Sequence, residues 1–579
     1  MTATPWGFRD ILPEEAQVRE GIAETVKACL RTHGYLPVET PLLEDKRALD
    51  GGARQLETPF KLFDDDGRLL VVRSDNTLPI VRLVSSRMDA GSLPLRLRYE
   101  APVVREQLRY TGNSRQFTQL GFELIGQGGT AGDAEVVGLA IEAVRALGLS
   151  DCRIVCGSVR PYQALLAQCD AALAREALRL VHANDFVDLD DRVDASAEPE
   201  ATKRAIRELP RVHGGLEALD RVDELLQAAG VTVPATAELR ELYAVLSGAD
   251  GADVLQAHLA FDFSLMNSFD YYTGLVFKVY AGGLPDPVGS GGRYDAVFDG
   301  VLEDAPHVPA AGFAFSLERL EGACEADAAA ADGGVPAVSA VAGGDYAVGR
   351  ASEAPLRIAV PKGSLKEGSV AALEAVGLDV EGLRDPGRHL IIRSHDTRGA
   401  VDGAGRSIGE VEFIIVRATD APAFVACGGA DCGICGRDSL IEADLRLLQL
   451  VDLRFGSCRF IEAEPAWRTG QAERAYARRG SLRVATKYPK IAAAWYASRG
   501  VVADIVQLHG NIELGPIVGM TDRIVDITAT GSTLRDNDLV ITGELFECTA
   551  RFFVNPGRAR LDERVRELAD RLAAYVAAR

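Results

Sequence analysis

The sequence predicts two domains of different fold class: an α+β domain built on an antiparallel sheet, followed by an α/β domain with parallel sheets. Three observations support this prediction. The chain of 579 residues is too long for a single hydrophobic core. Its composition changes sharply at 325–355. Strand-like and helical runs are mixed before this segment, whereas strands and helices alternate after it, as in parallel sheets covered by helices.

The amino-terminal part, 1–324, contains the signals of an antiparallel sheet. Apolar residues at helical spacing cover 15–32. Two strand-like runs, 93–106 and 115–126, surround a loop, which predicts an antiparallel pair. Runs rich in Ala and Leu fill 160–250, so we expect an inserted helical subdomain there. Strand patterns return at 258–282 and 309–315.

The segment 325–355 consists mainly of Ala, Gly, Ser, Val and Asp and has almost no large apolar side chains. Such a segment buries little surface, so we interpret it as a flexible linker. The alternative is an Ala-rich surface helix, which its Gly pairs and two prolines disfavour.

The carboxy-terminal part, 356–579, alternates short apolar strands with helices, which predicts parallel sheets. Strand-like runs lie at 356–360, 411–416, 481–486 and 523–528. The chain closes with an amphipathic helix. Its apolar side chains share one face: Leu561, Val565, Leu568, Leu572 and Tyr575.

The sharpest local signal is the segment 523–539, RIVDITATGSTLRDNDL. Its strand ends in Asp526, a residue placed to accept hydrogen bonds from sugar hydroxyls. Small residues follow whose backbone N–H groups can converge on one anion, namely Thr528, Ala529, Thr530, Gly531, Ser532 and Thr533. An acid beside a phosphate cradle is what a ribose 5-phosphate requires. The alternative is a Thr-rich turn between a strand and a capped helix.

Basic residues accompany the ends of other predicted strands. Lys362 and Gly363 follow the first strand directly, a position that suits a pyrophosphate. Three arginines could reach the same crevice, namely Arg388, Arg393 and Arg417. An acid, Glu513, lies at the opening of another helix. Taken singly, each of these residues is more often a surface charge.

Eight segments in one order carry a resemblance over 356–579. They are LRIAVPKGSL, HLIIRS, VRATDAPAFV, GGADCGICGRDSL, FGSCRF, LRVATKYP, LHGNIELGP and VDITATGSTLRDNDL. Together they resemble the catalytic subunit of ATP phosphoribosyltransferase, the first enzyme of histidine biosynthesis. The resemblance implies a two-lobed α/β fold like that of periplasmic binding proteins. It further implies transfer of a phosphoribosyl group from phosphoribosyl pyrophosphate to ATP.

The same resemblance assigns roles to residues. The segment from Asp526 to Thr533 would hold the ribose 5-phosphate, and Lys362, Arg388, Arg393 and Arg417 would meet pyrophosphate and ATP phosphates. Mg²⁺ would come with the substrates rather than through protein ligands. We assign no catalytic acid or base, because adenine N1 is already a nucleophile.

The sequence also departs from the family pattern. Lys487 stands where we expect Glu, and Cys432 and Cys435 stand where Leu and Thr or Ala are more usual. With Cys427, the two cysteines give the spacing C-x4-C-x2-C, which superficially matches an iron–sulfur site with Cys458. The favoured alternative is that these small residues pack a strand, a turn and a helix. The family's long form carries a further regulatory domain, and this sequence is similar to the short form, which needs a regulatory partner.

The amino-terminal part carries a second resemblance, over roughly 5–322. Arg98-Tyr99-Glu100 is followed by the segments RQFTQLGFELIG, MNSFDYYTGLVF, GSGGRYDAVF and AAGFAFSLERL, the last of which contains Arg319. Together they resemble histidyl-tRNA synthetase, which implies the antiparallel sheet of class II synthetases. Asn267 replaces the arginine expected to stabilise an adenylate. Ser316 replaces a glycine, and the linker and transferase replace the anticodon-binding domain.

A synthetase-like body without that arginine resembles the regulatory subunit of the transferase, so the chain is similar to a fusion of regulatory and catalytic subunits. The resemblance implies a pocket that binds histidine as a feedback inhibitor. Its residues would be Asp75, Thr77, Gln119, Glu123, Tyr271 and Tyr272. The alternatives are an active histidyl-tRNA synthetase with an added domain, and a non-catalytic binding protein.

Bulk properties restrict the partners. The net charge of −21 lowers the expectation of a tRNA or DNA partner. The sequence shows neither a signal peptide nor a run of about 18 apolar residues, so we expect a cytoplasmic protein without a membrane span. Ten scattered cysteines suggest reduced thiols. Because the separate subunits of this system form mixed oligomers, we expect a homo-oligomer.

Overall fold

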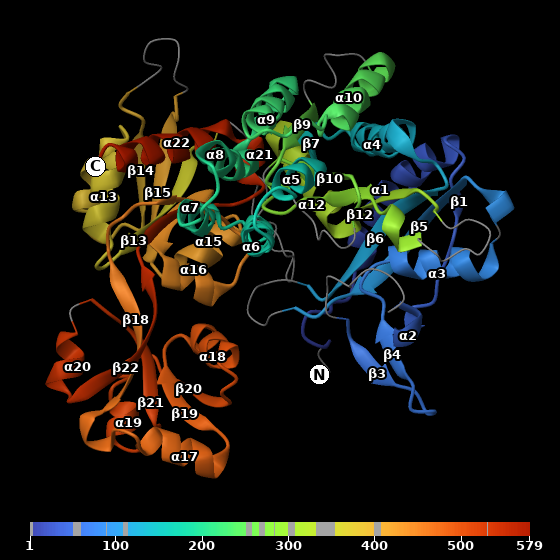
Figure 1. Cartoon of the computed structure of the whole chain (residues 1–579). Helices are drawn as coiled ribbons and strands as arrows, with labels where there is room; N and C mark the ends of the chain where they lie inside the picture. The colour runs from blue at the N-terminus through green and yellow to red at the C-terminus, as the bar shows by residue number, and fades with distance from the viewer. Residues whose placement is uncertain are drawn as a thin grey trace. The chain divides into compact units, whose positions relative to one another are not determined.

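The computed structural model describes residues 4–49, 59–88, 90–107, 114–250, 258–265, 272–282, 284–298, 307–331, 354–398, 407–529 and 531–579. They form two compact units (Figure 1). Unit 1 comprises Met1–Ala354 and Pro556–Glu563, and unit 2 comprises Pro355–Asn555 and Arg564–Arg579. The short segment Pro556–Glu563 therefore belongs to unit 1, although its neighbours on both sides in the sequence belong to unit 2.

Unit 1 is built on a nine-stranded sheet. In spatial order its strands are β1 (Leu36–Pro37), β5 (Leu95–Val104), β6 (Gln116–Ile125), β12 (Ala310–Ser316), β11 (Gly289–Arg293), β10 (Leu275–Ala281), β7 (Cys152–Ser158), β9 (Leu259–Asp262) and β8 (His213–Gly214). Within the six strands from β5 to β7, each strand is antiparallel to the next. Parallel pairs add β1 beside β5 and β9 beside β7. The predicted antiparallel sheet, including the pairing of β5 with β6, is confirmed.

Helices cover both faces of the central strands. One face meets α1 (Pro13–Thr32), α4 (Gly129–Ala146) and α12 (Leu317–Ala331). The other face meets α3 (Thr77–Arg87), which shares a buried cluster with Leu97, Tyr99 and Ile125. Side chains alternate between the faces of a strand, and directly opposed residues share a face. Glu123, which lies opposite Leu97, therefore points to the α3 side of the sheet.

Residues 160–250, for which we expected an inserted helical subdomain, form a run of short helices within unit 1. These are α5 (Arg160–Leu166), α6 (Ala171–His182), α7 (Phe186–Asp194), α8 (Glu200–Glu208), α9 (Leu216–Ala228) and α10 (Ala237–Asp250), with a 3-10 turn at Leu209–Arg211. A small three-stranded sheet precedes them. It contains β2 (Leu43–Asp45), β4 (Leu69–Val72) and β3 (Lys61–Phe63), with α2 (Lys46–Leu49) beside it.

The prediction of a linker is wrong at its amino-terminal end, because α12 continues through 325–331. Alanine has the strongest helix propensity, and Gly and Pro appear only after this stretch. The helix is anchored here. Ala326 is buried, and the Asp327 carboxylate accepts hydrogen bonds from the Ser150 hydroxyl at 2.7 Å and the Ser150 N–H at 3.2 Å. Residues 332–353 of the expected linker lie outside the described residues.

Unit 2 contains two sheets, which form two lobes (Figure 1). The first lobe has the order β14 (Ile391–His395), β15 (Glu410–Arg417), β13 (Leu356–Lys362), β16 (Cys432–Gly436), β23 (Ala550–Val554) and β17 (Leu448–Asp452). The second has the order β20 (Ala503–Gln507), β19 (Leu482–Thr486), β21 (Arg523–Thr528), β18 (Cys458–Pro465) and β22 (Leu539–Cys548). The expected parallel pairs are present at β15-β13-β16 and β20-β19-β21, but antiparallel strands flank both sets.

Helices connect and cover these strands. In the first lobe they are α13 (Lys366–Ala375), α14 (Glu381–Arg384), α15 (Ala421–Ala426) and α16 (Arg437–Ala443). In the second they are α17 (Gln471–Arg479), α18 (Pro489–Ser498), α19 (Leu514–Ile517) and α20 (Ser532–Asp536). The chain enters the second lobe through β18 and returns to the first through β22 and β23.

The end of the chain differs from the expected single helix. Leu561 lies in a separate short helix, α21 (Arg558–Leu561), whereas Val565, Leu568 and Leu572 are buried on α22 (Glu563–Ala577). Leu561 packs with the unit 1 cluster of Val155, Leu265, Val276 and Tyr280. None of the described helices is long and apolar enough to cross a membrane.

Candidate functional site

The loop after β21 has the geometry expected of an anion-binding turn. Gly531 adopts φ +71°, a left-handed conformation that favours glycine, and directly precedes α20. Its N–H donates a 2.9 Å hydrogen bond to the Thr528 hydroxyl, which closes the turn. The Ser532 and Thr533 side chains are exposed at the start of α20. Thr530 lies outside the described residues.

Asp526 lies near the end of β21, just before this loop, in an environment that raises the pKa of its carboxyl. Its carboxylate accepts a 2.8 Å hydrogen bond from the Ile527 N–H. Burial raises the pKa of Asp526 to about 6; the neighbouring Glu513 carboxylate adds to the rise, and the Lys487 ammonium opposes it. The structure thus brings together Asp526 and Glu513, which the sequence predicted as site residues, and Lys487, which it marked as a departure.

Two basic residues meet at one end of the first lobe. Lys362 ends β13 and Arg417 ends β15, and the two are direct partners in the parallel register. Both side chains are exposed. Gly363 follows Lys362 at φ +92°, and its carbonyl accepts a 3.0 Å hydrogen bond from the Lys366 N–H. The carboxyl ends of parallel strands are where open α/β sheets bind ligands.

The other two predicted arginines are separated by the structure. The exposed Arg388 precedes β14, near the end of β15, because the Ile415 N–H bonds to the Leu390 carbonyl. Arg393 lies farther along β14, opposite Glu412, with a 3.7 Å ion pair to that carboxylate. Glu412 precedes Arg417 by five positions, about 16 Å of strand. Arg393 therefore lies away from the edge where Lys362 and Arg417 meet.

A chain of polar contacts joins the two lobes beside this edge. Asp438 lies in the first turn of α16 of the first lobe, and Tyr488 directly precedes α18 of the second. The Tyr488 hydroxyl is hydrogen-bonded to Asp438 and lies near Asp526, and the Lys487 ammonium is 5.9 Å from the Tyr488 ring centre. Glu442 of α16 accepts hydrogen bonds from the first N–H groups of α18 at 3.1–3.2 Å. These contacts place the Asp526 loop on the side of the second lobe that faces the first.

In unit 1 the predicted effector residues converge on Glu123, which is 1% exposed. Its carboxylate accepts hydrogen bonds from the hydroxyls of Thr77 at 2.9 Å, Tyr99 at 3.3 Å, and Tyr294. Burial raises the pKa of Glu123 to about 8 despite these donors, and the nearby Asp75 charge adds to the rise. Burial also raises the pKa of Asp75 itself, while Arg105 opposes that rise. Two buried carboxyls with raised pKa values form a site suited to a cationic ligand.

Of the remaining predicted effector residues, Gln119 and Tyr272 lie within the described part of the chain. The Gln119 side-chain oxygen accepts hydrogen bonds from the Asn76 N–H at 3.1 Å and the Asn76 side-chain amide at 2.8 Å. This fixes Gln119 beside Asp75, whose carboxylate accepts from the Leu78 N–H at 3.3 Å. The Tyr272 ring lies against Gly292, where an added Cβ would be 2.6 Å from ring carbons. Tyr271 and Asn267 lie outside the described residues.

Glycine makes the room for Glu123. A Cβ on Gly312, which pairs with Glu123 across β12 and β6, would lie 1.7 Å from the Glu123 carboxylate. A Cβ on Gly121 would lie 2.5 Å from the Tyr99 hydroxyl. Any side chain at either position would displace the carboxylate or its donor. The absence of side chains at Gly121 and Gly312 thus makes the cluster possible.

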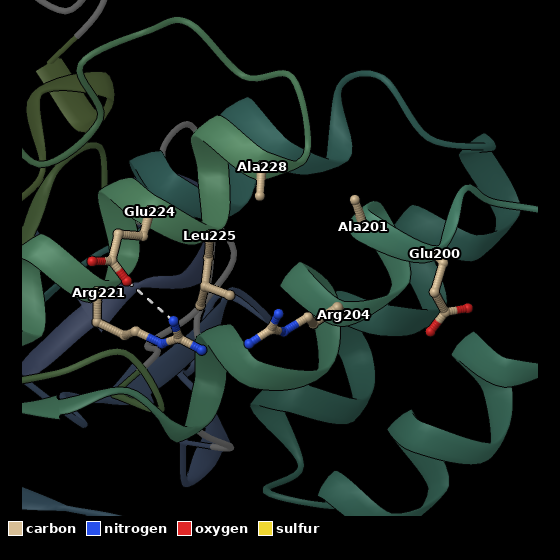
Figure 2. Close-up of a pocket in the computed structure, with 7 residues that line it drawn as sticks. All are labelled: Glu200, Ala201, Arg204, Arg221, Glu224, Leu225 and Ala228. Carbon is tan, nitrogen blue, oxygen red and sulfur yellow. Dashed lines mark hydrogen bonds and ion pairs between the residues drawn. The ribbon is translucent and has the colours of Figure 1, made fainter.

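A cavity of 280 Å³ also lies in unit 1, between α8 and α9 (Figure 2). It contains none of the predicted site residues. It is lined by Glu200, Ala201, Arg204, Arg221, Glu224, Leu225 and Ala228. Its charged residues form exposed ion pairs such as Arg221 with Glu224 at 3.1 Å, which indicates a solvated helix surface rather than a ligand site.

The iron–sulfur alternative does not fit the geometry of its cysteines. Cys432 and Cys435 lie three positions apart in β16, so their side chains leave opposite faces of the strand. Both are buried among apolar residues, and burial raises the pKa of Cys435 well above its usual value. Within the described part of the chain, no three His, Cys, Asp or Glu side chains are grouped to hold a metal ion.

Comparison with known proteins identifies a family for each of the two units. The family model described as ATP phosphoribosyltransferase matches residues 417–574, and that described as histidyl-tRNA synthetase matches residues 7–320. An ATP phosphoribosyltransferase of Rubrobacter xylanophilus is 45% identical over 206 residues, which are 36% of this chain and 89% of the relative. The chain belongs to the ATP phosphoribosyltransferase family. The match to the synthetase model covers more than half of the chain, so it also belongs to the histidyl-tRNA synthetase family.

The relatives of the amino-terminal part point to a regulatory role. An ATP phosphoribosyltransferase regulatory subunit of Moorella thermoacetica is 37% identical over 322 residues, 55% of this chain and 80% of the relative. A crystal structure from Bacillus halodurans, described as an ATP phosphoribosyltransferase regulatory subunit/histidyl-tRNA synthetase, is 28% identical with a TM-score of 0.51. That match covers 65% of this chain and 89% of the other. The chain thus joins a synthetase-like unit, unit 1, to a transferase unit, unit 2.

Sequence reasoning missed several residues of both sites. In the transferase unit these are Asp438 and Tyr488, and in the synthetase-like unit Asn76, Tyr99 and Tyr294. Tyr99 could have been found, because it lies in the strand that the sequence predicts to pair with the strand of Glu123. Tyr294 lies just beyond β11 and reaches Glu123 across β12, so its role depends on strand order that no local pattern reveals.

Proposed function

We propose that the transferase unit moves the phosphoribosyl group of phosphoribosyl pyrophosphate onto N1 of ATP. The N1 lone pair forms a bond to C1 of the ribose, and the bond from C1 to the pyrophosphate oxygen breaks. The products are N1-(5-phosphoribosyl)-ATP and pyrophosphate, and the first is committed to histidine biosynthesis. The single observation that carries this proposal is that Asp526, near the end of β21 and just before the turn at Gly531, lies close to Tyr488, which is hydrogen-bonded to Asp438 of the lobe that carries Lys362 and Arg417.

The residues of the two lobes supply different parts of this reaction. Ionised Asp526 accepts hydrogen bonds from ribose hydroxyls, and the turn around Gly531 binds the 5-phosphate through N–H and hydroxyl groups. Lys362 and Arg417 bind the negative charge that develops on the departing pyrophosphate or on ATP. Since N1 needs no activation, the contribution of the protein is to position the substrates and to stabilise charge.

Magnesium fits this site as an ion that the substrate brings. Lys362 and Arg417, at the strand ends of the first lobe, are cationic and suit anionic groups. When bound, Mg²⁺ would neutralise part of the diphosphate charge. Lys362 and Arg417 would add positive charge for the diphosphate oxygens.

We further propose that the synthetase-like unit binds histidine and inhibits the transferase. Glu123 and Asp75 would meet the ammonium group or imidazole of the ligand, and Thr77, Gln119 and the tyrosines would orient it. The hydroxyl-lined carboxyls support this assignment, because the charge of a bound cation stabilises their ionised forms and so opposes the desolvation that raises their pKa values. Neither the net charge of −21 nor the replacement of the adenylate-binding arginine by Asn267 favours tRNA charging. We expect a homo-oligomer in the cytoplasm.

The test is pyrophosphate release by the full chain supplied with ATP, phosphoribosyl pyrophosphate and Mg²⁺, with and without L-histidine. We expect turnover that histidine suppresses. Asp526→Ala should abolish turnover, whereas Glu123→Gln should preserve turnover and weaken inhibition. Turnover that histidine leaves unchanged would exclude inhibition by histidine but would still support the transferase activity. If there is no turnover but substrate binds, the transferase proposal is wrong and a binding protein takes its place.

A further inference from the structure

Two cysteines lie where the chain passes between the lobes of the transferase unit. Cys458 is the first residue of β18, the strand by which the chain enters the second lobe, and Cys548 is the last residue of β22, by which it leaves. The two strands are antiparallel, and Cys458 and Cys548 are direct partners in the register. Only Thr549 separates β22 from β23 of the first lobe.

This register satisfies the main geometric condition for a disulfide. Directly opposed residues of antiparallel strands have Cα atoms about 4.5–5.5 Å apart, within the range of about 4.4–6.8 Å that disulfides require. The two side chains are hydrogen-bonded to each other. Both thiols are free in this structure. Bridging them therefore needs no movement of the strands relative to one another.

The two thiols also have complementary reactivity. Cys458 is partly exposed, whereas Cys548 is 1% exposed. The hydrogen bond from Cys548 lowers the pKa of Cys458, while the same contact and then burial raise the pKa of Cys548. The nearby Asp438 raises both pKa values, and Arg437 opposes the rise at Cys548. Cys458 is thus the thiol that an oxidant reaches first, and Cys548 is the one placed to resolve it.

The position of the pair connects it to the active site. The residue after Cys458, Arg459, lies opposite Thr528, where the ribose-phosphate loop begins, and Ile461 lies opposite Asp526. Strand β18 pairs with β22 on one side and with β21 on the other. The cysteine pair therefore lies one strand pairing away from the strand that carries the loop. A bridge from β18 to β22 would also tie together the two connections about which the lobes can move.

We propose that Cys458 and Cys548 form a reversible disulfide that joins β18 to β22 and slows the transferase; the effect on turnover, but not the bond, rests on the function proposed above. A low-molecular-weight disulfide such as oxidised glutathione is the oxidant. The Cys458 thiolate attacks one of its sulfurs and releases one glutathione thiolate. Cys548 then loses its proton, attacks the Cys458 sulfur and releases the second glutathione. Two protein thiols are oxidised, and one small disulfide is reduced to two thiols.

Such a bond suits a reducing compartment, where protein disulfides are transient and sense redox state. The other cysteines of the transferase unit do not offer the same chemistry. Cys432 and Cys435 leave opposite faces of one strand, and Cys427 is exposed just after α15. Cys427 therefore serves as a matched control for non-specific oxidation.

The experiment treats the full chain with oxidised glutathione and then maps disulfides by mass spectrometry of unreduced peptides. We expect a peptide pair linked through Cys458 and Cys548, and a fall in turnover of about tenfold that a dithiol reverses. Cys458→Ser should keep basal turnover and resist the oxidant. Cys427→Ser should behave like the parent chain.

Three results would overturn the proposal: the linked peptides do not form, they form with no change in turnover, or Cys458→Ser is inhibited as strongly as the parent chain. Binding of phosphoribosyl pyrophosphate, measured by calorimetry before and after oxidation, gives a readout that does not need catalysis. If the chain shows no turnover under any condition, the proposed function fails. The bond and its effect on substrate binding are still decided by the peptide map and the calorimetry.

Discussion

The Arg560 guanidinium lies 3.2 Å from the carboxylate of Asp262, and both side chains are buried in unit 1. Arg560 also donates a 2.8 Å hydrogen bond to the Ser264 hydroxyl and lies over the Tyr280 ring. Through this residue, a segment from near the end of the sequence completes the sheet region at β9 and β10.

Removing Arg560 should therefore destabilise unit 1. Arg560→Ala leaves Asp262 buried without its charge partner, and breaking a buried pair from one side typically removes about 3–5 kcal/mol of stability. Hydrogen exchange should increase in β9 and β10 but not in β19 and β20 of unit 2. The double variant Arg560→Met with Asp262→Asn should recover part of the loss. Unchanged exchange in β9 would show that the pair contributes nothing.

Turnover should depend on pH through Asp526. The ionised carboxylate accepts the ribose hydroxyls, and its pKa is about 6, so kcat/KM should fall as the pH is lowered through about 6. Lys487→Met removes the positive charge that lowers this pKa, which should move the falling limb to higher pH. Asp526→Asn should be weakly active with no such limb. A limb that stays in place in Lys487→Met would mean that another group titrates.

Histidine binding should release a proton from Glu123. The pKa of buried Glu123 is about 8, so the group is mostly protonated at pH 7. A cationic ligand favours the carboxylate and lowers this pKa, so affinity should rise between about pH 6 and pH 8. Calorimetry in two buffers of different ionisation enthalpy measures the released proton. Glu123→Gln should remove that proton, since it lacks the titrating group; equal release by both proteins would exclude Glu123 as its source.

Lys362 and Arg417, the two basic residues at the strand ends, should contribute more to kcat/KM than Arg393. Lys362→Ala or Arg417→Ala should lower kcat/KM about 100-fold, the usual effect of removing one charge-stabilising donor. Arg393→Ala is the matched control, since Arg393 is exposed on the neighbouring strand but lies away from that edge. It should keep near-normal kcat/KM. An equal loss in all three variants would indicate a general effect of positive charge, not a site at the edge.

Much of this arrangement could be predicted from the sequence. The meeting of Lys362 with Arg417 follows from parallel strands that end together, and the Asp526 loop follows from a strand that runs into small hydroxyl residues. Residues that act through non-local register could not be predicted. Tyr294 reaches Glu123 only because β12 lies between β6 and β11. Tyr488 meets Asp438 only because the two lobes pack through α16 and α18.

The errors have physical causes as well. Composition predicted a linker from 325, but alanine is the best helix former and Asp327 anchors the helix to Ser150. Helical periodicity placed Leu561 on the final helix, but the chain leaves helical geometry at Asp562, and Leu561 packs in unit 1 instead. Periodicity alone cannot show where a helix is interrupted for contacts with distant residues.

The segment Pro556–Glu563 also sets the order in which the protein can be completed. Translation proceeds from the amino terminus, and unit 1 takes its last residues from near the other end of the chain. On the ribosome, the synthetase-like unit therefore stays without Arg560 until nearly the whole transferase unit has been synthesised. A gene cut within 332–353 would yield an amino-terminal product in which Asp262 never forms its ion pair with Arg560.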